Sequence, residues 1–153
     1  MRRDDNKGFT LAELLIVVAI IGVLVAISIP IFSKQLEKAR DATSVANLRS
    51  AYAESQTEVL SPSVSKNGYT DSTHHIALVL YPDGSVKNVT VFGVVLKSKK
   101  RNNWSELGNN LPFYEKISDK NNQGGDTGVA STAKVVFTYS DGDGSLESVT
   151  IIH

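Results

Sequence analysis

A nearly unbroken run of apolar residues extends from Phe9 to Phe32, and Glu13 is the one formally charged residue within it. A helix rises about 1.5 Å per residue, so a helix over this run reaches roughly 30 Å or more. That length is enough to cross the hydrocarbon core of a bilayer. The pattern therefore predicts a membrane-spanning helix over residues 9–32.

A second helical pattern follows directly, over residues 33–60. Apolar side chains recur there at steps of three and four, and Pro62 with its flanking serines predicts the end of an amphipathic helix. We assign to its apolar face Phe32, Leu36, Ala39, Ala42, Val45, Ala46, Leu48, Tyr52, Ala53 and Val59, and to its other faces Lys34, Glu37, Lys38, Arg40, Asp41, Arg49 and Glu54. Such a helix needs a cover for its apolar face, and the rest of the chain can supply it.

Residues 61–153 carry β-type patterns separated by turn signals. Strands are predicted over 74–81, 86–96 with a break at Gly93, 134–139 and 146–152, with turns at 82–84 and 141–144. Candidate core anchors between the second and third strands are Trp104, Leu107, Leu111, Phe113 and Tyr114. We expect an α+β fold, in which a long N-terminal α-helix packs on a small antiparallel sheet as a stalk with a globular head.

Two residues weaken the second half of the apolar run. Gly22 lowers helix stability by roughly 1 kcal/mol relative to alanine. Pro30 has no backbone N–H and disfavours helical geometry at Ile29, which predicts a kink. Such a kink can be a harmless feature of a helix in lipid.

Glu13 is a lone carboxylate near one end of the apolar run. If the chain were cut after Gly8, Phe9 would carry a new α-amino group about one helical turn from Glu13. The Glu13 carboxylate could then pair with the Phe9 amine of a neighbouring copy, which would set the register between subunits. Alternatively, Glu13 lies at the level of the lipid headgroups and stays solvated. Both interpretations remain open from charge placement alone.

Composition and charge narrow the class of protein. The chain has 153 residues, no cysteine and a formal net charge of zero, so its head has no disulfide and the chain has no overall attraction to nucleic acid. Arg2, Arg3 and Lys7 precede the apolar run and favour a cytoplasmic N-terminus, although basic residues also follow the run. A conventional secretory signal would have a shorter apolar region.

The C-terminal hairpin contains a candidate calcium site. Asp141, Asp143, Ser145 and Glu147 alternate as oxygen ligands do in calcium loops, but the full spacing of a calcium-binding hand is absent. Asp-Gly repeats are also typical of a hairpin turn, which is the interpretation we favour.

Basic residues offer a second candidate site. Lys97, Lys99, Lys100 and Arg101, followed by Trp104, could contact phosphate and stack on a base, although such a run is more often a solvated loop. The adjacent residues His74 and His75 have no spaced ligand partners, so we predict no metal site there. No acid–base pair or phosphate loop can be located in the sequence, and we therefore expect neither an enzyme nor a bound cofactor.

The segment Lys-Gly-Phe-Thr-Leu-Ala-Glu-Leu-Leu-Ile-Val-Val-Ala-Ile-Ile-Gly-Val-Leu, residues 7–24, resembles the class III signal and N-terminal helix of type IV pilins and pseudopilins. The close resemblance covers residues 7–39. It implies a pilin fold, removal of the leader 1–8 by a prepilin peptidase that cuts after Gly8, and N-methylation of Phe9. It also implies a role for Glu13 in assembly and for Gly22 and Pro30 in local melting of the helix. The missing C-terminal disulfide departs from many members of the family.

The resemblance implies a structural subunit of a type IV pilus filament. The precursor would lie in the bacterial cytoplasmic membrane, and an assembly platform with its ATPase would polymerise it through residues 9–32 into an extracellular homopolymer. The alternative is a pseudopilin of a type II secretion or DNA-uptake machine, and a third class is a membrane-anchored binding module that does not polymerise. Adhesion, motility and DNA uptake all remain open as roles of the head.

Overall fold

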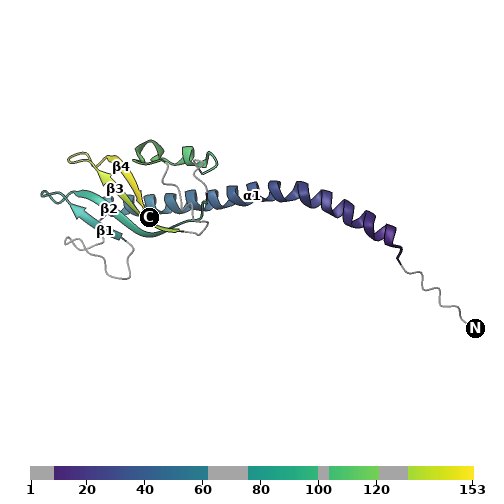
Figure 1. Ribbon diagram of the computed structural model, residues 1–153. Coiled ribbons are helices and arrows are strands. Elements are labelled where there is room, and N and C mark those ends of the chain that lie inside the picture. Colours follow the sequence, from purple (N-terminus) through teal and green to yellow (C-terminus); the bar gives the residue numbers. More distant parts are fainter. Residues whose placement is uncertain (1–8, 62–75, 100–103, 121–130) are drawn as a thin grey trace, which may run out of the picture. The chain divides into compact units, whose positions relative to one another are not determined.

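The computed structural model describes residues 9–61, 76–99, 104–120 and 131–153. They form one helix, α1 (Leu11–Leu60), four strands, β1 (Ile76–Leu80), β2 (Val86–Leu96), β3 (Ser131–Tyr139) and β4 (Leu146–Ile152), and two 3₁₀ turns, η1 (Leu107–Asn110) and η2 (Tyr114–Lys116) (Figure 1). The expected α+β class, with one long N-terminal helix and an antiparallel sheet, is confirmed. The chain divides into two compact units, Met1–Leu36 and Glu37–His153.

The sheet is an antiparallel meander in the order β1-β2-β3-β4. Leu78, Val89, Phe137 and Val149 pair across all four strands and form one buried row, which the period of two in the sequence predicts. The predicted break at Gly93 is a register shift in β2, where Gly93 adopts a φ of 72° that glycine permits. The predicted start of the first strand at His74 lies outside the described residues.

The core of the second unit lies between the sheet and residues 37–60 of α1. Of the predicted anchors, Trp104, Leu111 and Phe113 are buried, and Leu107 and Tyr114 are partly buried against them. The ring of Phe113 lies 5.0 Å from that of Tyr52 on α1 and 5.6 Å from that of Phe137 on β3, edge-to-face with the latter. These three aromatic side chains join the helix, the sheet and the segment between β2 and β3.

The predicted apolar face of the amphipathic helix is partly wrong. Val45 and Leu48 are buried as expected, but Ala39, Ala42, Ala46 and Ala53 are exposed to solvent. The buried residues of α1 are instead Glu37, Asp41, Ser44, Val45, Leu48, Ala51, Ser55 and Glu58. They recur with the period of 3.6 residues that an α-helix requires, but polar side chains occupy both ends of the face.

The buried polar residues at the start of this face bind the chain that leaves β2. Glu37 Oε1 accepts a hydrogen bond of 2.7 Å from the Lys99 N–H. Ser44 Oγ accepts bonds from the N–H groups of Lys97 and Ser98, at 2.8 and 3.0 Å, and from the Ser98 hydroxyl. Buried backbone donors need such partners once a strand has ended. Glu37, which the pattern assigned to another face, and Ser44 therefore hold the chain at the end of β2 on the helix.

Near the C-terminal end of α1, Ser55 holds the end of β3 on the helix through Tyr139. Its hydroxyl lies 2.9 Å from the phenolic oxygen of Tyr139, to which the Gln56 amide also donates. Burial raises the pKa of the Tyr139 phenol, so this hydroxyl stays protonated at neutral pH. Polar contacts thus fix both ends of the packed part of α1, residues 37–60, on the sheet. Apolar side chains fill the space between these two contacts.

We predict that Ser44→Ala destabilises the second unit by about 2 to 3 kcal/mol, because it leaves buried N–H groups without an acceptor. Ser50→Ala is the matched control, since Ser50 is exposed on the same helix, and its effect should stay within about 0.5 kcal/mol. Urea unfolding of the full chain in detergent micelles, followed by the fluorescence of the one tryptophan, measures both changes. Equal stability of the two variants would contradict the structural role of Ser44.

Candidate functional site

The start of α1 is a capping box. The Glu13 carboxylate oxygen Oε2 accepts hydrogen bonds of 2.9 Å from both the N–H and the hydroxyl of Thr10. The Thr10 hydroxyl in turn accepts a bond of 3.3 Å from the Glu13 N–H. This reciprocal arrangement satisfies backbone donors that a helix start otherwise leaves free. Thr10 is thus a functional residue that the sequence analysis missed, although Thr-Leu-Ala-Glu has the spacing of the motif.

The capping box gives Glu13 a role within its own chain, which neither sequence-based interpretation included. Both hydrogen bonds from Thr10 go to Oε2, so Oε1 is not used by the box. All atoms of the box belong to Thr10 and Glu13, so the box does not depend on the peptide bond between Gly8 and Phe9. Phe9 is 89% exposed, and Gly8 lies outside the described residues.

The helical part of the first unit is apolar and uncovered. α1 contains an 18-residue window with a mean hydropathy of 3.1, none of which is buried, so by length and composition this helix can cross a membrane. Fifteen large apolar side chains from Leu11 to Phe32 are exposed. Patches of this size on a protein surface mark contacts with lipid or with other proteins. The described residues therefore leave this apolar segment without a cover.

Gly22 and Pro30 do not interrupt α1, which is helical from Leu11 to Leu60. Two serines on either side of Pro30 donate to backbone carbonyls one turn earlier: Ser28 to Leu24 at 2.6 Å and Ser33 to Ile29 at 3.0 Å. Such bonds supply donors to a helix backbone that proline weakens. Local melting at Gly22 and Pro30 remains a prediction.

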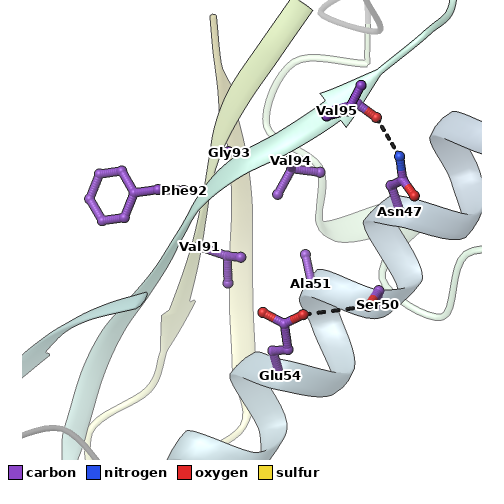
Figure 2. A pocket seen from close by; sticks show the side chains of 9 residues that line it. All are labelled: Asn47, Ser50, Ala51, Glu54, Val91, Phe92, Gly93, Val94 and Val95. Atoms are coloured by element: carbon purple, nitrogen blue, oxygen red, sulfur yellow. Dashed lines mark hydrogen bonds between the residues drawn. The ribbon is translucent and has the colours of Figure 1, made fainter. Parts of the chain in front are cut away.

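A groove of about 220 Å³ lies between α1 and the irregular part of β2 (Figure 2). The Asn47 amide donates to the Val95 carbonyl at one end, and Glu54 lies at the other (Figure 2). The ring of Phe92 points away from the helix (Figure 2). Among the residues that line the groove, Glu54 is the one titratable group. Acid–base chemistry needs a second group, so the groove carries no catalytic pair.

The candidate calcium residues lie in the turn between β3 and β4. The Asp143 carboxylate accepts hydrogen bonds from the Ser140 hydroxyl and, at 2.9 Å, from the Ser145 N–H. These bonds hold the pKa of the Asp143 carboxyl below its usual range. Asp141 and Glu147 are exposed. Asp143 thus acts as the turn residue that we favoured, and the described residues contain no group of three or more acidic or histidine side chains placed for a metal.

The candidate nucleic-acid contact is partly wrong. Trp104 is fully buried in the core, so its ring cannot stack on a base. Lys97 is exposed and Lys99 is partly exposed, whereas Lys100 and Arg101 lie outside the described residues, as do His74 and His75.

We predict that Thr10→Ala lowers the stability of the first turn of α1 by about 1 kcal/mol, because it removes the N-cap. Hydrogen exchange of the Glu13 amide in micelles should then quicken about fivefold, as that free energy implies. Glu13→Gln is the control, since glutamine can also accept the bond from the Thr10 N–H. Unchanged exchange in Thr10→Ala would exclude the cap.

Comparisons with known proteins place this start of α1 in a described family. Residues 3–29 match the family described as the prokaryotic N-terminal methylation motif. The match includes Phe9, the capping box and most of the uncovered apolar segment. No solved structure is significantly similar to the chain.

Three curated proteins are similar to part of the chain. The type IV major pilin protein PilA of Myxococcus xanthus is 51% identical over 47 residues, which are 31% of this chain and 21% of that protein. The type IV narrow pilus major component PilA5 of Thermus thermophilus is 55% identical over 51 residues, 31% of this chain and 43% of that protein. The fimbrial protein EcpB of Eikenella corrodens is 56% identical over 35 residues, 23% of this chain and 22% of that protein.

The chain therefore matches less than half the length of each of these relatives. By this methylation motif and by its likeness to type IV pilins over about a third of its length, the N-terminal part of the chain is similar to type IV pilins.

Proposed function

We propose that the chain is a structural subunit of a type IV pilus filament. The observation that carries this proposal is the uncovered apolar part of α1, which starts in a capping box within the methylation motif. A segment of this kind is stable in a bilayer as a precursor and between the helices of other subunits in a polymer. The relatives are themselves described as pilus proteins, which supports the same function.

Processing is the first step of the proposed pathway. A prepilin peptidase removes residues 1–8 by cutting the bond between Gly8 and Phe9, and the new amine of Phe9 is methylated. The motif match over residues 3–29 and the high exposure of Phe9 support this step. The precursor is anchored in the cytoplasmic membrane with its N-terminus on the cytoplasmic side, and the basic leader agrees with this orientation.

Assembly is the second step, in which an ATPase and an assembly platform move the subunit from the membrane into a homopolymer. The apolar residues of the first unit then form the filament core, and Gly22 and Pro30 allow the helix to extend. We propose that Glu13 pairs through Oε1 with the Phe9 amine of a neighbour while Oε2 keeps its own helix capped. The pairing avoids an unpaired charge in an apolar environment.

A pseudopilin role is the second candidate, and one observation favours it. The chain has no cysteine, so it lacks the C-terminal disulfide that many pilins of the resembled family have. Long extracellular filaments on cells would select the pilus, and short filaments confined to the envelope would select the pseudopilus.

Processing is tested by intact mass and N-terminal sequencing of the protein from its native cells. We expect a mature chain that starts at N-methylated Phe9. A substitution at the cleavage site, Gly8→Val, should leave residues 1–8 attached, whereas Asp5→Asn in the same leader is a control that should be cut normally. A wild-type chain that still starts at Met1, in cells that contain the peptidase, would overturn the proposed function.

The role of Glu13 is tested by Glu13→Gln, which keeps the size of the side chain and the capping bond but removes the charge. We expect normal processing and at least a tenfold loss of filaments on electron micrographs, because the neighbour's amine then has no counter-charge. Glu54→Gln, an exposed substitution on the same helix, should leave filaments unchanged. Wild-type filament numbers in Glu13→Gln would instead support a solvated Glu13.

A further inference from the structure

Basic side chains gather at one end of the second unit. Lys97 and Lys99 leave β2 with their N–H groups bonded to Ser44 Oγ and Glu37 Oε1, so both residues lie beside the first turns of α1 in this unit. Lys38 and Arg40 belong to those same turns. We call Lys38, Arg40, Lys97 and Lys99 the basic end. Lys38 and Lys97 are exposed, and Arg40 and Lys99 are partly exposed.

Two acidic residues beside the basic end, Glu37 and Asp41, are buried and do not face solvent. Glu37 is 6% exposed, and its carboxylate lies 3.4 Å from the guanidinium of Arg40 and accepts the Lys99 N–H. Asp41 is fully buried and accepts the Ser105 hydroxyl. Glu106, next to Ser105, is exposed, so an approaching molecule meets the four residues of the basic end and one carboxylate, which together are net positive.

The opposite end of the unit carries mainly negative charge, with Lys87 over the Tyr81 ring as a basic residue among the acidic ones. The turns after β1 and after β3 lie together at the end of the sheet away from Lys97, and the Tyr81 hydroxyl of the first donates to the Tyr139 carbonyl beside the second (Figure 1). Burial, together with the negative charges of Glu147, Asp141 and Asp83, raises the pKa of the Tyr81 phenol. Along the strand direction, the second unit thus has excess positive charge at the C-terminal end of β2 and excess negative charge at the turns after β1 and β3.

The basic end is also the end at which the unit joins the apolar run. Lys38 follows Phe32, the last residue of that run, by six positions. A chain of six residues spans at most about 22 Å when extended and about 9 Å as a helix. This limit holds whatever the placement of the two units. When residues 9–32 cross a bilayer, the basic end therefore lies within reach of the headgroups and close to the roughly 8 Å range of screened charge.

We propose that the basic end binds an anionic lipid surface, such as the phosphodiester headgroups of phosphatidylglycerol, on the side of the membrane where the second unit emerges. This inference rests on the membrane-embedded precursor of the proposed function. Lysine and arginine beside a membrane are attracted to anionic lipids, and the acidic turns are repelled from them. The contact holds the precursor with its acidic turns pointing away from the membrane, and it is released when the subunit enters the filament.

The single tryptophan gives a direct test. Trp104 is buried next to Ser105, whose hydroxyl binds Asp41 at the basic end, so its position reports that of this end. The full chain is reconstituted into phosphatidylcholine vesicles with or without 30% phosphatidylglycerol, each containing a dansyl-labelled lipid headgroup as the acceptor of energy transfer from Trp104. We expect higher transfer in the anionic vesicles at low salt, and a fall to the phosphatidylcholine value in 0.5 M salt as screening increases.

Charge-reversal variants test which residues of the basic end contact the lipid headgroups. Lys97→Glu with Lys99→Glu should reduce transfer in anionic vesicles to the phosphatidylcholine value, because the backbone bonds to Ser44 and Glu37 do not need the lysine side chains. Lys116→Glu is the matched control, since η2 lies beside the middle of β4, and it should leave transfer unchanged. An unchanged Trp104 emission maximum verifies the fold of each variant, and Lys38→Glu provides an independent change on the helix.

Two results would overturn the inference in distinguishable ways. A wild-type chain that floats with both kinds of vesicle and shows equal transfer in both would exclude the lipid contact and leave the proposed function intact. If the charge reversal then lowered filament numbers, the basic end would bind the acidic turns of a second copy instead. A chain that floats with neither kind of vesicle would overturn the membrane anchor, and this inference with it.

Discussion

The constraint on which the molecule depends is the apolar surface of α1 between Leu11 and Phe32, which nothing in the described chain covers. Its large side chains are each roughly half exposed, and covering them stabilises the assembly by on the order of 1 kcal/mol per side chain. Lipid can provide that cover for a precursor, and the helices of neighbouring copies can provide it in a filament. The apolar area that is covered changes little when the helix moves from lipid into a filament. Polar groups therefore determine the position and register of the helix.

Polar contacts accordingly lie at the start of α1 and at the start of its part in the second unit. At its start, Thr10 and Glu13 satisfy backbone donors within one turn and leave one carboxylate oxygen unused by the box. In the second unit, Glu37, Asp41 and Ser44 replace apolar side chains on the buried face and bind the chain beyond β2. Each of these groups has a defined partner, so the helix can have only one register on the sheet.

Positive and negative charges are separated along the second unit, although the formal net charge of the whole chain is zero. Basic residues lie where the unit joins the apolar run, and acidic residues lie in the turns at the far end of the sheet. A neutral protein with separated charges has little long-range repulsion between copies, yet it orients near a charged surface. The same arrangement would suit the proposed filament subunit, first at a membrane and then among identical copies.

The sequence by itself determined the elements that depend on local pattern: the long helix, the four strands, the bulge at Gly93 and the aromatic anchors. These follow from apolar periodicity and turn chemistry, which act over a few residues. Only the tertiary structure decided which face of the helix is buried, because alanine is small enough to be exposed and Glu37, Asp41 and Ser44 are acceptable inside only where the chain beyond β2 supplies donors. It likewise decided between the two roles that the sequence offered for Trp104, core anchor and base-stacking ring, and it decided that charges far apart in the sequence gather at opposite ends, since both depend on contacts between distant segments.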